Sequence, residues 1–166
     1  MDFTHLSQIG QVQQVHGLLI SSGQPSIEAL IQIREAGYQN IINLALQDAS
    51  NALPHEDRIV LQQGMDYYHL PLLWDQPSVS QGLVILELLH HLCEQPTWVH
   101  CALNKRVSCL IYLYRRYYMG VDLPTAHELL EQIWQPDATW TGWMFAVEQQ
   151  LKLQRPLNAD EDCWQF

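Results

Sequence analysis

The chain has 166 residues, of which 48% are apolar and 16% are charged, as in globular rather than disordered proteins. Eight Lys and Arg residues against 18 Asp and Glu residues give a net charge of −10, which argues against nucleic acid or an anionic membrane as a partner. The N-terminus lacks the basic start and apolar core of a signal peptide, and the four cysteines have no paired spacing. We therefore expect a cytoplasmic protein without structural disulfides.

Hydrophobic periodicity and turn residues predict an alternation of strands and helices along the chain. The first strand is followed by a helix that Ser26 caps and Gly37 ends. The predicted strands cover residues 17–21, 40–46, 66–70 and 97–100, and the later helices cover 55–63, 80–93, 107–119, 124–134 and 139–153. We expect Arg115 and Arg116 on the solvated face of their helix, and Trp134, Trp140 and Trp143 packing the last two helices over the sheet.

This order predicts an α/β fold with a mainly parallel sheet of four to five strands and helices on both faces. Residues 1–154 form a single domain in this interpretation. The acidic segment 155–166 has no periodicity, and we expect a C-terminal tail that is either loose or docked through Trp164. Reactive loops gather at the carboxyl ends of parallel strands, which is where Cys101 and Asp75 fall.

Cys101 stands between the predicted strand 97–100 and the helix that follows it. Backbone N–H groups and the positive end of a helix dipole would converge beside its sulfur and favour the thiolate. The same arrangement binds a tetrahedral oxyanion, and Arg106 can form paired hydrogen bonds to two of its oxygens. A nucleophile beside an anion site predicts covalent chemistry on a phosphate ester.

The run His100-Cys101, a short loop, Arg106 and Ser108 resembles the signature of the cysteine-dependent protein tyrosine and dual-specificity phosphatases. Those enzymes place five residues between Cys and Arg, whereas four stand here, Ala102 to Lys105. A bacterial branch of phosphatase-like proteins with the shortened loop is more similar, and the resemblance covers roughly residues 15 to 150. Its other matching segments are 22–26, 42–44, 70–71, 74–78 and 133–136.

The resemblance implies that Cys101 attacks phosphorus and that Arg106 holds the phosphoryl oxygens. It also implies that the loop residues bind the phosphorylated substrate or an inorganic oxyanion. These are His100, Ala102, Leu103, Asn104 and Lys105. Asn104 tolerates the left-handed backbone angles of a tight turn, whereas an apolar side chain at Leu103 has no evident chemical role.

Asp75 and Ser108 complete the expected site, and each has a second interpretation. Asp75 would protonate the leaving group and then activate water, because a loop upstream of the cysteine strand supplies the acid in the wider family. It could equally cap a turn or the next helix. Ser108 would donate a hydrogen bond to the sulfur, or to a backbone carbonyl within its own helix.

The main hypothesis is thus a phosphatase that needs neither a metal nor an organic cofactor. His90, His91 and Cys93 do not share one helix face and predict no metal site. One alternative is a phosphate-binding module without turnover, since a shift of about 1 Å at Arg106 can cost on the order of a hundredfold in rate. A rhodanese-like sulfurtransferase, which also uses a tight cysteine loop, is a less favoured alternative.

Overall fold

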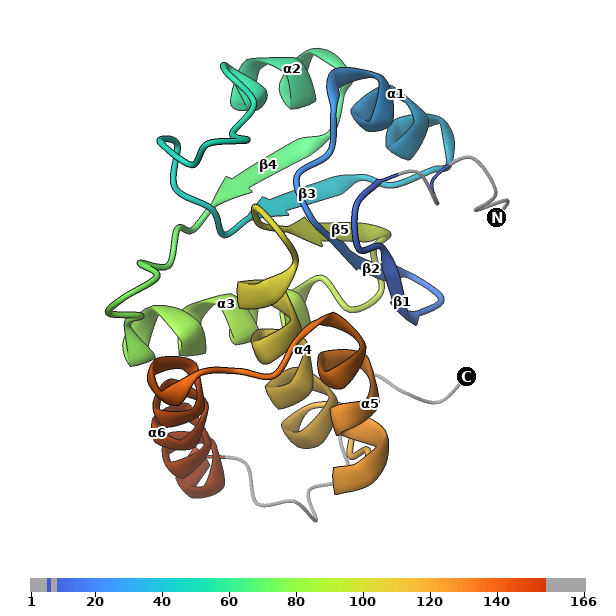
Figure 1. The fold of residues 1–166 in the computed structure, drawn as a ribbon. Coiled ribbons are helices and arrows are strands. Elements are labelled where there is room, and N and C mark those ends of the chain that lie inside the picture. The colour runs from blue at the N-terminus through green and yellow to red at the C-terminus, as the bar shows by residue number, and fades with distance from the viewer. Residues whose placement is uncertain (1–5, 7–8, 155–166) are drawn as a thin grey trace.

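The computed structural model describes residue 6 and residues 9–154 of the chain. A five-stranded sheet has the strand order β1-β2-β5-β3-β4 (Figure 1). Its strands are β1 (Gln13–His16), β2 (Leu19–Ser22), β3 (Asn40–Asn43), β4 (Asp66–His69) and β5 (Thr97–His100). Strands β2, β5, β3 and β4 pair in parallel, and only β1 pairs antiparallel, with β2. The predicted α/β class and mainly parallel sheet are confirmed.

Helices lie on both faces of this sheet, as Figure 1 shows. One face carries α1 (Ile27–Glu35) and α2 (Glu56–Gln62). The other carries α3 (Val79–His91), α4 (Lys105–Tyr117), α5 (Leu123–Ile133) and α6 (Ala138–Gln154). Successive residues of a strand point to opposite faces, so Trp98 packs in the core beneath α1 while Val99 packs in the core beneath α4.

The edge strand β1 was not predicted from the sequence. Its residues Gln13-Gln14-Val15-His16 are mostly polar, and only Gln13 is buried. Such a strand needs no apolar run, because its main contribution is backbone pairing with β2 across a short turn. The strand that was predicted over 17–21 is β2, shifted toward the C-terminus by the turn at Gly17.

Two arginines of α4 correct another expectation. Arg115 is only 9% exposed, and its Nη1 donates to the carbonyl of Ala126 at 3.4 Å. Arg116 is half-buried and donates from Nη1 to the carbonyl of Val121 at 2.6 Å. These side chains therefore tie α4 to α5 and its preceding loop instead of forming a solvated face.

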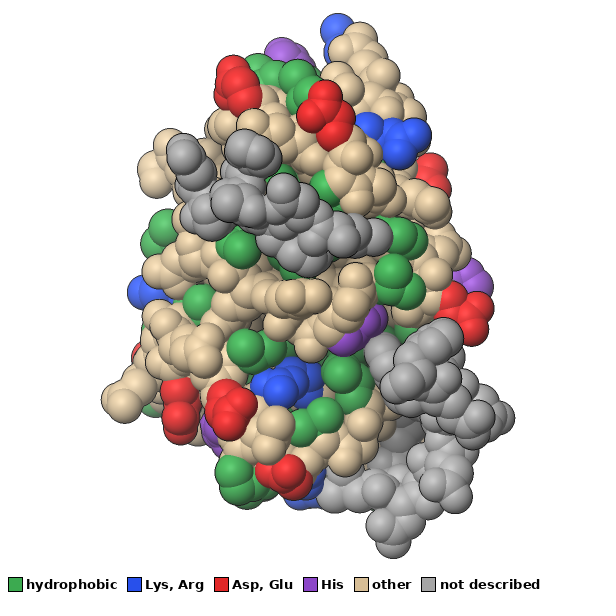
Figure 2. Space-filling view, turned by 90° about the vertical axis from the view of Figure 1, so that its right-hand side faces the viewer, with side chains coloured by type: hydrophobic (Ala, Val, Ile, Leu, Met, Phe, Trp, Pro, Cys, Tyr) green, Lys and Arg blue, Asp and Glu red, His purple; other side chains and the backbone are tan. Residues whose placement is uncertain are grey.

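Among the described residues, no helix combines the length and the apolar character needed to cross a membrane. Figure 2 shows one face, on which acidic and basic side chains are scattered and the described residues form no continuous basic area. The predicted tail 155–166 lies outside the described residues.

Candidate active site

Cys101 follows β5 directly, and β5 lies between β2 and β3 in the middle of the sheet. Its N–H donates to the carbonyl of Ser22 at 3.3 Å, which continues the β2–β5 pairing into the loop. Helix α4 begins four residues later, at Lys105. The predicted strand, cysteine loop and helix are therefore present, with the loop at the carboxyl end of a central parallel strand.

The loop is fixed from one side by the turn after β2. The carbonyl of Ala102 accepts hydrogen bonds from the N–H of Gln24 at 3.2 Å and from Nδ2 of Asn51 at 2.8 Å. Gly23 forms a bridge with Leu103, and a Cβ at Gly23 would lie 3.1 Å from the Ala102 carbonyl oxygen. Only a glycine allows this close approach without displacing the loop. Leu103 thus contributes backbone pairing, while its side chain is 55% exposed.

Asn104 makes the tight turn into α4. Its φ of 60° is left-handed, which asparagine adopts more readily than most residues. Its buried side chain donates from Nδ2 to the carbonyl of Gln11 at 2.7 Å and to Oγ of Ser21 at 3.2 Å. Asn104 therefore shapes the loop from beneath and does not line the pocket.

A pocket of about 210 Å³ lies over the cysteine. Its lining residues are Trp74, Cys101, Ala102, Leu103, Lys105 and Arg106. Cys101 is itself only 1% exposed, and it is one of the residues that line this pocket. Two cations and no carboxylate are among these six residues, which suits an anion.

Arg106 is nearly buried and has no hydrogen bond at Nε with any described residue. The Trp74 ring faces it instead, with the guanidinium carbon 5.4 Å from the ring centroid. Lys105 is placed in the same way, its Nζ lying 5.1 Å from the centroid of Trp134. Both cations stand in the first turn of α4, where the helix dipole disfavours them unless an anion is nearby.

Three tryptophans support these cations from the α4–α6 side. The ring centroid of Trp74 lies 5.4 Å from those of both Trp134 and Trp140. Trp140 donates from Nε1 to the carbonyl of Trp74 at 3.1 Å, so the loop after β4 is anchored on α6. The sequence prediction placed Trp134 and Trp140 in helix packing, and the structure adds this contact with the pocket wall.

Ser108 makes the second of its two predicted contacts, a hydrogen bond to a backbone carbonyl of its own helix. Its hydroxyl donates to the carbonyl of Lys105 at 2.9 Å within α4, and its oxygen accepts from Trp134 Nε1 at 3.2 Å. A hydroxyl has one proton to donate, so the bond to the sulfur is not made in this arrangement. Ser108 here links α4 to the indole beneath Lys105.

Asp75 is exposed in the loop between β4 and α3 and does not line the pocket, although the preceding Trp74 does. Cys109, the residue after Ser108, is buried, and burial raises the pKa of its thiol far above the ordinary value. Among the residues described, no group of three His, Cys, Asp or Glu side chains could hold a metal ion.

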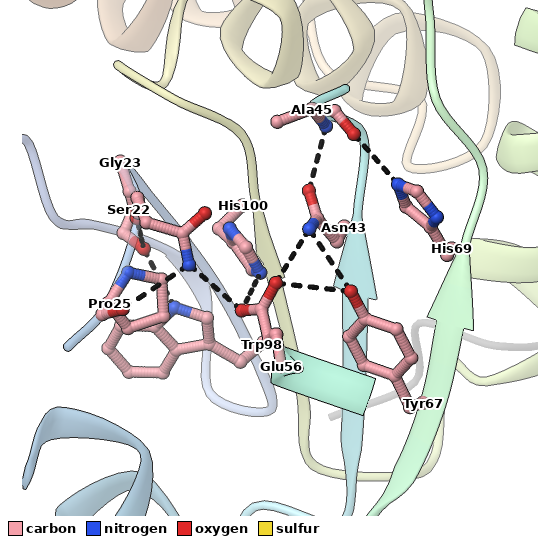
Figure 3. Close-up of polar contacts among 11 residues, drawn as sticks. Ser22, Gly23, Pro25, Asn43, Ala45, Glu56, Tyr67, His69, Trp98 and His100 are labelled. Carbon is pink, nitrogen blue, oxygen red and sulfur yellow. Dashed lines mark hydrogen bonds and ion pairs between the residues drawn. The ribbon is translucent and has the colours of Figure 1, made fainter. Parts of the chain in front are cut away.

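Sequence reasoning missed Glu56, the residue that contacts His100. His100 is fully buried, and its Nε2 lies 3.0 Å from Oε1 of Glu56, which begins α2 (Figure 3). Burial alone would raise the pKa of Glu56, but its contacts with His100, Gln24 and Tyr67 outweigh burial and lower it. The helix dipole is the ordinary explanation for a carboxylate in the first turn of a helix. The position of Glu56 in the sequence therefore did not indicate that it contacts His100.

No model of a known protein family matches the sequence, and no curated protein matches it by sequence. Solved structures do match. A candidate phosphatase (DUF442) from Shewanella putrefaciens CN-32 is 25% identical with a TM-score of 0.80, over 90% of this chain and 99% of that chain. The catalytic domain of the PP-IP phosphatase SIW14 from S. cerevisiae, in complex with citrate, is 17% identical with a TM-score of 0.70, over 91% and 96%.

TpbA from P. aeruginosa, in complex with phosphotyrosine, is 16% identical with a TM-score of 0.61, over 83% of this chain and 90% of that chain. These structures share the fold of the cysteine-dependent protein tyrosine and dual-specificity phosphatases. The present chain has this fold over most of its length, and the resemblance first seen in the segment 100–108 is confirmed.

Proposed function

We propose that the chain is a cysteine-dependent phosphatase that hydrolyses phosphate monoesters through a phosphocysteine intermediate. The observation that carries this proposal is the pocket over Cys101, whose only charged lining residues are Lys105 and Arg106. A thiol at the base of a cationic pocket and before a helix N-terminus is suited to attack on phosphorus. Two structural neighbours are named as phosphatases and a third has phosphotyrosine bound, which supports the same chemistry.

The proposed reaction has two steps. The Cys101 thiolate forms a bond to phosphorus as the ester oxygen leaves with its electron pair, and a general acid donates a proton to that oxygen. Arg106 and the loop N–H groups hold the three remaining oxygens throughout. Water then attacks phosphorus and gives a proton to the carboxylate left by the general acid, while the P–S bond breaks, so that phosphate is released and the thiolate is restored.

Asp75 is the proposed acid, although it does not line the pocket. Its neighbour Trp74 contacts Arg106 directly, so an oxyanion on Arg106 would meet the loop that carries Asp75. Acid groups often reach their working position only when substrate is bound. The exposed position of Asp75 is compatible with such a movement.

One observation favours a second candidate, a phosphate-binding module without turnover. The Ser108 hydroxyl is engaged with Lys105 and not with the sulfur, which leaves the leaving thiolate with one donor fewer. The discriminating test is hydrolysis of an aryl phosphate by the wild type and by Cys101→Ser. Activity that Cys101→Ser abolishes supports the enzyme. Phosphate binding without any hydrolysis by the wild type supports the binding module.

A further inference from the structure

The buried carboxylate of Glu56 receives polar groups from four segments of the sheet and its loops (Figure 3). Gln24 donates from Nε2 to Oε1 at 2.9 Å, and His100 Nε2 lies 3.0 Å from the same oxygen. Asn43 donates from Nδ2 to Oε2 at 2.7 Å, and the Tyr67 hydroxyl donates to it at 3.1 Å. The carboxylate thus accepts three hydrogen bonds and also lies within ion-pair distance of His100.

Two of these contacts lead to the residues on either side of Cys101. His100 precedes the cysteine and touches Glu56 directly. Gln24 touches Glu56 with its side chain and donates its backbone N–H to the carbonyl of Ala102, which follows the cysteine. The Glu56 carboxylate is thus connected to the residue before Cys101 and to the residue after it.

The backbone at the start of α2 places the Glu56 carboxylate in this position. His55, the residue before Glu56, has a φ of 57°, a left-handed conformation that is uncommon for residues other than glycine. Its side chain makes no capping hydrogen bond to the helix. Sparsely populated backbone conformations persist where the surrounding structure fixes them, and they gather at functional sites.

We infer that Glu56 is a positioning residue that holds the cysteine loop in its anion-binding shape through His100 and Gln24. The role of that shape in catalysis rests on the proposed function, whereas the positioning itself does not. An ionised, buried carboxylate that accepts three hydrogen bonds and lies beside His100 is costly to displace. His100 and Gln24 are therefore held at fixed positions, and the cysteine loop that they adjoin is held with them.

The test replaces one oxygen of this carboxylate in Glu56→Gln, with Asp57→Asn as the matched control. Asp57 is the next residue of α2 and is exposed. The glutamine amide keeps the size of the side chain but turns an NH₂ group toward donors that need an acceptor. The first readout is amide hydrogen exchange of residues 102–106, and the second is the rate of Cys101 alkylation by iodoacetamide at a fixed pH.

We expect Glu56→Gln to speed exchange in residues 102–106 by at least about tenfold while α3 and α6 keep their rates. Alkylation of Cys101 should slow, because the loop N–H groups are no longer held beside its sulfur. In a His100→Asn background the same substitution should change the alkylation rate much less, because the two residues act through one contact. Asp57→Asn should change neither readout.

Equal exchange rates in the wild type and Glu56→Gln would overturn the inference, and so would an increase spread evenly over the whole chain. If Glu56→Gln does not fold, Gln24→Ala decides instead, since it keeps the carboxylate and removes one of the two side chains through which Glu56 reaches the loop. Faster exchange confined to 102–106 in that variant supports positioning, and unchanged exchange contradicts it. A wild type that hydrolyses no phosphate ester would remove the proposed phosphatase but leave the exchange result to decide on Glu56.

Discussion

The guanidinium carbon of Arg106 lies 5.4 Å from the centroid of the Trp74 ring, and this contact joins the anion-binding residue to the loop that carries Asp75. The indole face covers a cation that has no hydrogen bond at Nε with the described residues. A ring attracts the cation without occupying its N–H groups as a carboxylate would. Arg106 is therefore held in place and still free to bind an oxyanion.

Trp74→Ala should weaken phosphate binding about five- to thirtyfold, as expected for loss of a largely desolvated cation–π contact of about 1–2 kcal/mol. Trp74→Phe should retain part of the affinity, because a smaller aromatic face remains. The measurement is a phosphate titration followed by thermal melting. Trp143→Phe is the control, since Trp143 donates to the Ser78 carbonyl away from the pocket. An unchanged affinity in Trp74→Ala would show that the ring does not position Arg106.

Gly23→Ala should disturb the cysteine loop, whereas Gly17→Ala should not. A Cβ at Gly23 meets the carbonyl oxygens of Gly10 at 3.0 Å and Ala102 at 3.1 Å, while a Cβ at Gly17 meets nothing within 4 Å. Overpacking of this kind costs about 1–3 kcal/mol, and here the strain falls on the loop. We expect Gly23→Ala to lose aryl phosphate hydrolysis at least about tenfold in kcat/KM. Equal kinetics in both variants would contradict this description of the loop.

Glu56→Gln should destabilise the protein most near neutral pH. The folded pKa of Glu56 lies below its ordinary value of 4.5, so its stabilising contribution is present above that pH and is lost as the pH falls through the folded pKa. Loss of one partner of a buried pair costs about 3 kcal/mol, which lowers the Tm by roughly 6 to 12 °C at about pH 7. The Tm difference should shrink as the pH is lowered below 4.5, and a constant difference would mean that the charge is unimportant.

Asp75→Asn should slow hydrolysis of alkyl phosphates more than that of aryl phosphates, because a poor leaving group depends more on its proton. The ratio of the two kcat values reports this directly. Asp137→Asn is the matched control. Asp137 is also exposed, and its Oδ1 caps α6 by accepting from the N–H of Trp140 at 3.0 Å. If Asp137→Asn changes the ratio and Asp75→Asn does not, the acid comes from the segment before α6.

Local sequence signals were sufficient for most of the fold. The apolar strands, the capping serine of α1 and the glycines after the helices are all local features, and the parallel sheet follows from their order. Strand β1 was not predicted because a polar edge strand carries no apolar pattern. The segment 98–108 also revealed the cysteine loop, since its strand, turn and helix are contiguous in the sequence.

Contacts between distant segments could not be predicted in the same way. Glu56 and His100 are separated by 44 positions, which is the difference between their residue numbers, and nothing local indicates that they meet. The contact of Trp74 with Arg106 likewise depends on how the loop after β4 folds back over α4. Arg115 was placed on a solvated face because its spacing alone does not show that α5 covers it.

The measurement that tests the central claim most directly is rapid acid quenching of the wild type during turnover of a radiolabelled aryl phosphate. If Cys101 attacks phosphorus, label should accumulate on the peptide that contains Cys101, and Cys101→Ser should show neither label nor hydrolysis. Asp75→Asn should retain the label on the same peptide. Hydrolysis that proceeds without label on the Cys101 peptide, or that survives in Cys101→Ser, would contradict the account.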